Sequence, residues 1–279
     1  MAVASLYADG DEVEAIRLAA KEHRITVSVG ISEKARYSSA TLWNSNLIIS
    51  PDGEVLAHHR KLMPTFYEKL VWSPGDGYGL KVVDIPANSQ LSDLEVQANN
   101  SAKLGMLICG ENTNPLARYA LMAQGEQIHI TTWPAKAPMR AIARGQGNDS
   151  PADAGNLQVN GTPNDAVKKP AVLGTYDNLA ANRTRAAEHC FESKCYGVIC
   201  SGFMTPEMIS ELVSGAPSHA KEIVASTFEL LSQAESLFLD PSGSVLPGFV
   251  IDEHGNHQAA DSAIRGGYYL CRHGHCRHY

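Results

Sequence analysis

The chain has 279 residues, 44% of them hydrophobic, which is enough for one large α/β domain or two small ones. It carries 23 basic and 30 acidic residues, a formal net charge of −7, and no basic run, so nucleic acid is not an expected partner. It contains neither a signal-peptide pattern nor an apolar run of bilayer length, so the sequence predicts a cytoplasmic protein with no membrane partner.

The first half of the chain alternates between helix and strand patterns. Residues 11–23 place apolar side chains at helical spacing behind acidic ones, and the β-branched run 25–31 follows as a strand. Pro51-Asp52-Gly53 joins two strand-like runs into a hairpin, because proline presets φ and glycine accepts positive φ. The next predicted elements are strands at 80–86 and 103–109, a helix at 114–125 and a strand at 127–133.

Residues 136–174 break this pattern. They are rich in Gly, Asn, Asp and Pro, and they have too few large apolar residues to offset their chain entropy, so they are predicted to form a disordered insertion. No domain boundary or repeat is evident, which favours a single domain over residues 1–279. Behind the insertion we expect a helix at 176–194, a strand at 196–203, a helix at 221–233 and a hairpin at 236–252.

Cys109 ends a predicted strand directly before a predicted helix. Free backbone N–H groups at such a junction can hold an oxyanion and favour a thiolate, so Cys109 is a candidate nucleophile. The alternative is a cysteine that only fills a buried strand. Lys61 and Glu68 could supply a cation and a proton acceptor to a thiol, or they could be a solvated surface pair.

The other five cysteines are not expected to do chemistry. Cysteines this sparse, in a chain without a secretory pattern, do not indicate a disulfide framework. Cys190, Cys195 and Cys200 are interpreted as packing residues. The tail CRHGHCRHY contains ligand-type side chains, but it lacks the two well-separated pairs typical of zinc sites, so no metal is expected there.

Three segments resemble the nitrilase branch of the carbon–nitrogen hydrolase superfamily, particularly its fungal, arylacetonitrilase-like members. They are HRKLMPTFYEKLVW at 59–72, LICGENTNPLARYALMAQGEQIHITTWP at 107–134 and YDNLAANRTRAAEHCFESKCYGVICSGF at 176–203. The resemblance implies an αββα sandwich, homodimers that associate further into spirals, and no metal or organic cofactor. It also implies Cys109 as nucleophile, Lys61 as the anion-stabilising lysine and Glu68 as the second glutamate, with the N–H of Gly110 beside Lys61 at the anionic centre.

The implied reaction converts a small-molecule nitrile to its carboxylic acid and ammonia, through a thioimidate and then a thioester on the cysteine. An amide-forming hydratase, an amidase or a catalytically defective homologue are the alternatives. In cyanide hydratases the cysteine is usually followed by Trp-Glu-Asn, whereas this chain has Gly110-Glu111-Asn112, which favours a nitrilase. Which nitrile is hydrolysed stays open.

The chain departs from the family pattern at both ends. The family's first glutamate lies in a segment resembling FPEAFIPGYP, before the helix that matches 11–23, and this chain begins almost at that helix. We therefore expect an N-terminally truncated sandwich with little or no turnover. Residues 265–279 form an atypical tail: one possible coding sequence for 267–279, read one base later, gives GIIYADMDIADT, which resembles the family's GILYADIDL, so the tail is predicted to be an out-of-frame translation.

Overall fold

The computed structural model describes residues 4–86, 101–134, 178–202, 205–222, 224–225, 236–246, 249–251, 257–259, 269–272 and 275–278. The chain divides into two compact units, one of residues 1–133, 182–201 and 235–279, and the other of residues 134–181 and 202–234. The predicted insertion at 136–174 and most of the predicted helix at 221–233 lie outside the described residues. The single domain over 1–279 stays a prediction.

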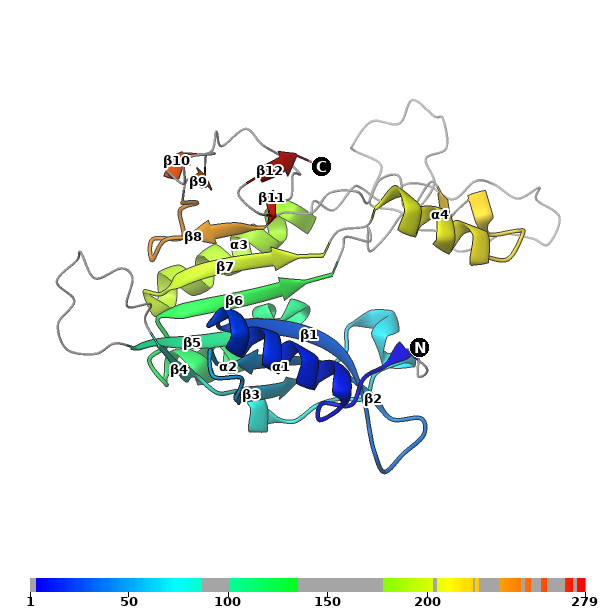
Figure 1. The fold of residues 1–279 in the computed structure, drawn as a ribbon, viewed down its shortest axis with the longest axis horizontal. Coiled ribbons are helices and arrows are strands. Elements are labelled where there is room, and N and C mark those ends of the chain that lie inside the picture. The colour runs from blue at the N-terminus through cyan, green and yellow to red at the C-terminus, as the bar shows by residue number, and fades with distance from the viewer. Residues whose placement is uncertain are drawn as a thin grey trace, which may run out of the picture. The chain divides into compact units, whose positions relative to one another are not determined.

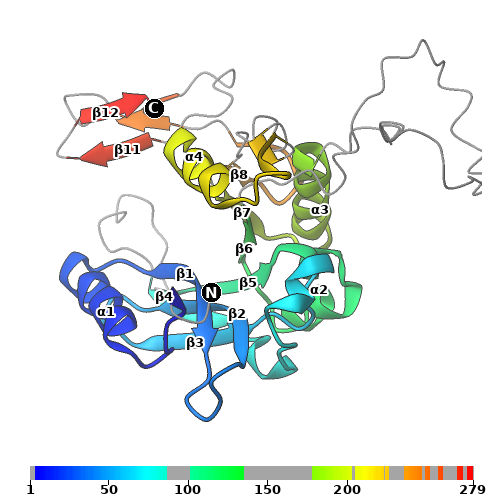
Figure 2. The same ribbon diagram turned by 90° about the vertical axis from the view of Figure 1, so that its right-hand side faces the viewer.

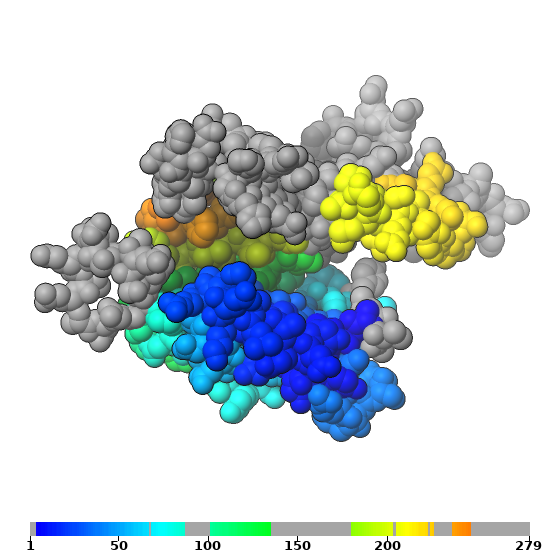
Figure 3. Space-filling view, viewed as in Figure 1, coloured from blue at the N-terminus to red at the C-terminus, as the bar shows by residue number. Residues whose placement is uncertain are grey.

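Helix α1 (Asp11–His23) covers the residues predicted for it. Its first turn carries three acids, Asp11, Glu12 and Glu14, which the helix dipole favours. Arg24 ends the helix in the left-handed conformation, with φ 51°. Figure 3 shows α1 in dark blue on the surface of the first unit.

The first sheet is antiparallel, in the order β1-β2-β3. Its strands are β1 (Val27–Lys34), β2 (Leu42–Ile49) and β3 (Val55–Arg60). The predicted hairpin between β2 and β3 is confirmed: the N–H of Gly53 donates to the carbonyl of Ser50 at 2.9 Å, and Gly53 has φ 81°. A Cβ at Gly53 would lie 2.8 Å from the carbonyl oxygen of Arg17, so α1 also packs too closely on this turn for a larger residue.

The second sheet has the order β4-β5-β6-β7-β8. Its strands are β4 (Val83–Pro86), β5 (Ser101–Ile108), β6 (Ile128–Trp133), β7 (Tyr196–Ser201) and β8 (Leu237–Leu239). The central strands β5, β6 and β7 run parallel, whereas β4 and β8 are antiparallel to their neighbours. The carboxyl ends of the three central strands therefore meet at one edge, and Cys109 follows directly after β5.

The hairpin predicted at 236–252 is only partly confirmed. The chain turns at Asp240 to Gly243, and Leu239 forms an isolated antiparallel bridge with Val245. Phe249–Ile251 (β9) then pairs with His257–Ala259 (β10) instead of extending the hairpin. In the tail, β11 (Tyr269–Arg272) pairs antiparallel with β12 (His275–His278). The out-of-frame origin of this tail stays a prediction.

The two sheets pack face to face between helices, so the predicted αββα sandwich is confirmed (Figures 1 and 2). Between the sheets, Ile48 and Ala57 of the first pack with Leu104 and Met106 of the second. The outer face of the first sheet is covered by α1. The outer face of the second is covered by α2 (Pro115–Met122) and α3 (Asn178–Ser193).

Arg118 joins the two helices on this outer layer. Its guanidinium donates to Glu188 at 3.0 Å and to Glu192 at 2.6 Å, and both acids lie on α3. Beneath the helices, apolar side chains of α2 pack on Leu107, whereas those of α3 pack on β6, β7 and β8. Helix α2 begins at Asn114, whose side chain accepts the N–H of Leu116 at 3.0 Å, as the predicted start at Asn-Pro requires.

The second unit contains a helix that the sequence analysis missed, α4 (Pro206–Gly215). The side chain of Thr205 accepts the N–H of Met208 at 3.2 Å, and Pro206 occupies the first helical position. The Thr-Pro-Glu start was the signal available for it. Among the described residues, no helix has the length and apolar character that crossing a bilayer requires.

Candidate active site

Cys109 lies where β5 ends and the short 3-10 helix η5 (Cys109–Thr113) begins. It has φ 52°, a left-handed conformation that costs a non-glycine residue about 1–2 kcal/mol, so the surrounding structure must hold it there. Its thiol is half-buried rather than enclosed. Cys109 therefore sits in a tight turn directly after the strand and also contacts the core beneath α3, and its role as nucleophile stays a prediction.

Lys61 is buried and forms an ion pair with Glu68, which is half-buried. The Nζ of Lys61 donates to Oε2 of Glu68 at 2.6 Å, and the lysine side chain is 0% exposed. The same oxygen accepts the N–H of Thr65 at 2.6 Å, which folds the glutamate back onto the start of the 3-10 helix η2 (Phe66–Leu70). The alternative of a solvated surface pair is therefore wrong: a buried ammonium needs its partner.

The charges of this pair act on Cys109. Burial raises the pKa of the Cys109 thiol above its ordinary value of 9.0. The positive charge of Lys61 opposes this rise, and the negative charge of Glu68 adds to it. Because the net effect is upward, Cys109 is a thiol at neutral pH and needs a base to become a nucleophile.

Gly110 lets the turn at Cys109 approach the turn at Glu68. A Cβ placed on Gly110 would lie 2.9 Å from Oγ1 of Thr65, so alanine would require at least that hydroxyl to move. The N–H of Gly110 interacts with the Cys109 thiol and lowers the pKa of that thiol. Glycine at this position therefore lets η5 lie close to Thr65, the N-cap residue of η2.

Glu111, which sequence reasoning did not single out, connects the two halves of the site. Its buried carboxylate accepts the N–H of Leu62 at 2.6 Å and the N–H of Ile108 at 2.8 Å. Nε2 of His59 lies 2.9 Å from one of its oxygens. Leu62 follows Lys61, the proposed cation, and Ile108 precedes Cys109, the proposed nucleophile. The Glu111 side chain therefore fixes the backbone next to each of these two residues.

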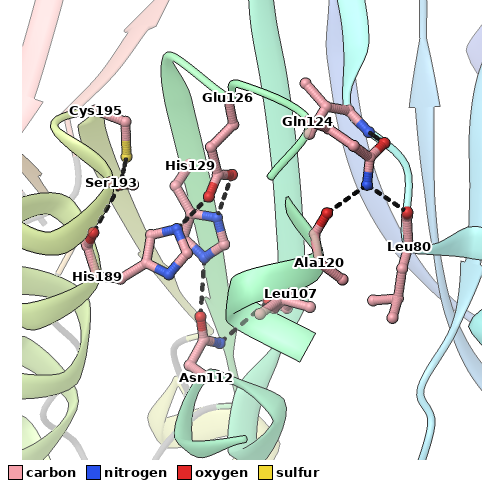
Figure 4. Close-up of polar contacts among 11 residues, drawn as sticks. Leu80, Leu107, Asn112, Ala120, Gln124, Glu126, His129, His189, Ser193 and Cys195 are labelled. Carbon is pink, nitrogen blue, oxygen red and sulfur yellow. Dashed lines mark hydrogen bonds and ion pairs between the residues drawn. The ribbon is translucent and has the colours of Figure 1, made fainter. Parts of the chain in front are cut away.

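A second buried polar group lies behind Cys109, and Figure 4 shows it. Nδ2 of Asn112 donates to the carbonyl of Cys109 at 3.0 Å, and Oδ1 of Asn112 is 3.0 Å from Nε2 of His129. Nδ1 of His129 is 2.9 Å from Glu126, whose other oxygen contacts His189 of α3. The pattern Glu-x-x-His in 126–129 was the only local signal for this group.

Glu126, His189 and Cys195 are close enough together to be considered as metal ligands. In this structure each oxygen of Glu126 is in direct hydrogen-bonding contact with a histidine instead. The side chains of the Cys/His tail lie outside the described residues.

The packing role predicted for three cysteines holds for two of them. Cys190 and Cys195 are 0% exposed and contribute to the core beneath α3, whereas Cys200 on β7 is exposed, so the prediction for Cys200 is wrong. The odd-numbered neighbours of Cys200 on β7 face the core, and alternation along the strand turns Cys200 outward. A hydrogen bond with Cys190 lowers the pKa of Cys195 to about 5 against the effect of burial, but its burial keeps it from substrate.

The chain is similar to enzymes that act on carbon–nitrogen bonds. The carbon–nitrogen hydrolase family matches residues 2–249. The bromoxynil-specific nitrilase of Klebsiella pneumoniae subsp. ozaenae is 41% identical over 130 residues, 47% of this chain and 32% of that enzyme. The cyanide hydratase of Stereum hirsutum is 45% identical over 131 residues, 47% of this chain and 31% of that enzyme. The arylacetonitrilase of Fusarium vanettenii is 35% identical over 139 residues, 50% and 38% of the two chains.

The chain spans about a third of the length of these curated relatives. Among solved structures, a carbon–nitrogen hydrolase from Helicobacter pylori G27 has a TM-score of 0.52 at 15% identity, covering 85% of this chain and 62% of that one. Saccharomyces cerevisiae Nit3, a member of branch 10 of the nitrilase superfamily, has a TM-score of 0.51 at 15% identity, covering 84% and 59%. At this identity the likeness concerns the fold alone.

Proposed function

The chain belongs to the carbon–nitrogen hydrolase family, and on that basis we propose that it hydrolyses a nitrile to a carboxylic acid and ammonia, with Cys109 as nucleophile. The observation that carries the proposal is the ion pair of the buried Lys61 with Glu68, whose charges act on the half-buried Cys109 thiol. A cation and a carboxylate beside one thiol are the groups that nitrile hydrolysis needs. The nitrilase and the arylacetonitrilase among its relatives support the same substrate class.

Glu68 is the proposed proton carrier. Among the described residues its Oε1 accepts no hydrogen bond, whereas Oε2 is held by Lys61 and Thr65. Oε1 can therefore take the proton of the Cys109 thiol, or that of a water, and return it to the substrate nitrogen. Lys61 stabilises the negative charge that develops on that nitrogen, and the N–H of Gly110 is the proposed second donor.

The steps balance with two waters. The sulfur of Cys109 adds to the nitrile carbon and the nitrogen takes a proton, giving a thioimidate. The first water adds to the same carbon, ammonia leaves with the proton it needs, and a thioester remains. The second water releases the carboxylic acid and restores the thiol. No external oxidant or reductant takes part.

An amide product is the second candidate, because the chain is 45% identical over 131 residues to a cyanide hydratase. After the first water has added, the tetrahedral carbon can expel either ammonia or the cysteine sulfur. Expulsion of ammonia gives the acid, and expulsion of sulfur gives the amide. Which product forms depends on whether the nitrogen or the sulfur is protonated when the tetrahedral intermediate breaks down.

The test is product analysis with purified chain and a panel of nitriles and amides that includes phenylacetonitrile and cyanide. In contrast to the little or no turnover expected from the sequence, Glu68 acting as the base would give ammonia and acid in equal amounts from at least one nitrile. Amide as the main product would support the hydratase alternative, and no product from any compound would contradict the proposal and favour a defective homologue. Homodimers, spirals and a cytoplasmic location stay predictions.

Charge changes at Lys61 and Glu68 should move the titration of Cys109 in opposite directions. In Lys61→Met the pKa of the thiol should rise further, because the opposing positive charge is gone, whereas in Glu68→Gln it should fall. The measurement is the rate of iodoacetamide labelling of the Cys109 peptide as a function of pH, followed by mass spectrometry.

Lys69→Met is the matched control, because Lys69 is an exposed lysine next to Glu68 in η2. This substitution should leave the midpoint of the labelling curve unchanged. A Lys61→Met midpoint equal to that of the control would contradict the proposed electrostatic role of Lys61.

A further inference from the structure

The peptide bond between Cys109 and Gly110 carries two groups of interest. Its carbonyl oxygen belongs to Cys109 and accepts a hydrogen bond from Nδ2 of Asn112 at 3.0 Å. Its N–H belongs to Gly110 and is the proposed oxyanion donor. A trans peptide is planar, and its C=O and N–H point in opposite directions. Whatever holds the carbonyl therefore also aims the N–H.

The hydrogen-bond directions around Asn112 are fixed by its neighbours. Nδ2 donates to two carbonyls, those of Cys109 and of Leu107, the second at 3.3 Å. The amide therefore cannot flip without facing oxygen with oxygen, and its Oδ1 must be an acceptor. The partner of Oδ1 is Nε2 of His129, which must then carry a hydrogen.

The same reasoning continues to Glu126. Since Nε2 of His129 carries one hydrogen, the 2.9 Å contact of its Nδ1 with Glu126 requires a second proton between those two atoms. The other oxygen of Glu126 contacts Nε2 of His189. The two imidazole rings are stacked, with centroids 3.8 Å apart, and all four polar residues are buried. Each group is thus held on at least two sides (Figure 4).

We propose that Asn112, His129 and Glu126 are positioning residues that hold Cys109 in its left-handed turn and aim the N–H of Gly110 at the substrate. This rests on the proposed role of Cys109 as nucleophile. The left-handed turn costs about 1–2 kcal/mol and would relax if the carbonyl were released. Relaxation would rotate the Gly110 N–H away and carry the thiol away from Lys61.

The test compares isosteric changes. Asn112→Asp removes the donor to the Cys109 carbonyl while keeping the side-chain shape, and we expect kcat for phenylacetonitrile to fall about 10²-fold with little change in KM, as for a lost oxyanion donor. Glu126→Gln can keep every hydrogen bond, because its amide can donate to Nδ1 of His129 and accept from His189. We expect the kcat of Glu126→Gln to stay within about threefold of that of the unmodified chain.

Asn46→Asp is the matched control, since Asn46 is 1% exposed and its side chain accepts from Ser28 on β1 rather than contacting Cys109. Thermal unfolding is recorded for every variant, and kcat is measured well below each transition. Asn112→Ser leaves room for a water and provides a milder variant if Asn112→Asp does not fold. A merely structural role would lower the melting temperature of the Asn112 variants without lowering kcat.

A second readout separates this proposal from the proposed function. If the unmodified chain releases no product from any nitrile, the function fails, and iodoacetamide labelling of Cys109 at pH 8 still tests the positioning. We expect at least fivefold slower labelling in the Asn112 variants, because their thiol loses Lys61. Asn112 variants with the same labelling rate and kcat as Asn46→Asp would overturn the proposal. A fall in kcat for Glu126→Gln as large as that for Asn112→Asp would also overturn it.

Discussion

Replacing Cys109 with alanine should lower ammonia release from nitriles by roughly 10⁴-fold or more, because the carbon–sulfur bond of the thioimidate cannot form. The free energy of unfolding should change by less than about 1 kcal/mol, since the thiol is half-buried and alanine is only slightly smaller. Ammonia release and thermal unfolding of the same preparation check both parts. Retained turnover would show that another residue is the nucleophile.

Glycine at position 109 is the informative companion variant. It should be equally inactive, but it should be about 1 kcal/mol more stable than the alanine variant, because glycine adopts φ 52° without steric cost. The difference in unfolding free energy between the two variants measures the strain held at Cys109. An alanine variant at least as stable as the glycine variant would show that the left-handed turn carries no strain.

The second large effect is expected at Glu111. Glu111→Leu leaves three buried donors without their acceptor, those of His59, Leu62 and Ile108, and should cost about 3–5 kcal/mol. This is a large part of the 5–15 kcal/mol that holds a typical domain together, so unfolding should begin at a much lower urea concentration. Glu111→Gln should cost less, about 2 kcal/mol, because its oxygen can still accept some of these bonds.

Urea unfolding followed by fluorescence and circular dichroism gives these free energies. Glu188→Gln is the control, because Glu188 is 52% exposed and its ion pair with Arg118 should be worth no more than about 1 kcal/mol. Glu111→Gln should also slow the labelling of Cys109, since the backbone beside Lys61 is no longer fixed to the backbone beside Cys109. If Glu111→Leu lowered the free energy of unfolding no more than Glu188→Gln does, Glu111 would not be needed to hold the site together.

The elements that were predicted correctly have local causes. The acidic first turn of α1 (Asp11–His23), the Pro-Asp-Gly turn at 51–53 and the apolar run 103–108 are all readable within a few residues. The limits of strands were less predictable, because strand ends depend on partners: β1 runs on to Lys34, where it pairs with Leu42 of β2. Helix α4 was missed although its start carries a regular capping signal.

The site divides in the same way. Cys109, Lys61 and Glu68 were found because they lie in long motifs that resemble a family. Glu111 and His59 are 52 positions apart in the chain, and Glu126 and His189 are 63 apart, so nothing in their local sequence shows that they meet. Their importance comes from burial, since a buried carboxylate must be paired, and burial appears only once the sheet is assembled.

The group behind Cys109 also constrains how this sequence can vary over evolutionary time. A chain that replaced His189 alone would leave one oxygen of a buried carboxylate unpaired, and a chain that replaced Glu126 alone by an apolar residue would strand two imidazoles. Single steps away from this set are therefore costly, whereas a joint change to apolar residues of similar volume need not be. Among sequences that descend from this chain, positions 126, 129 and 189 should therefore be retained together or substituted together. Exposed positions such as Glu188 should vary independently.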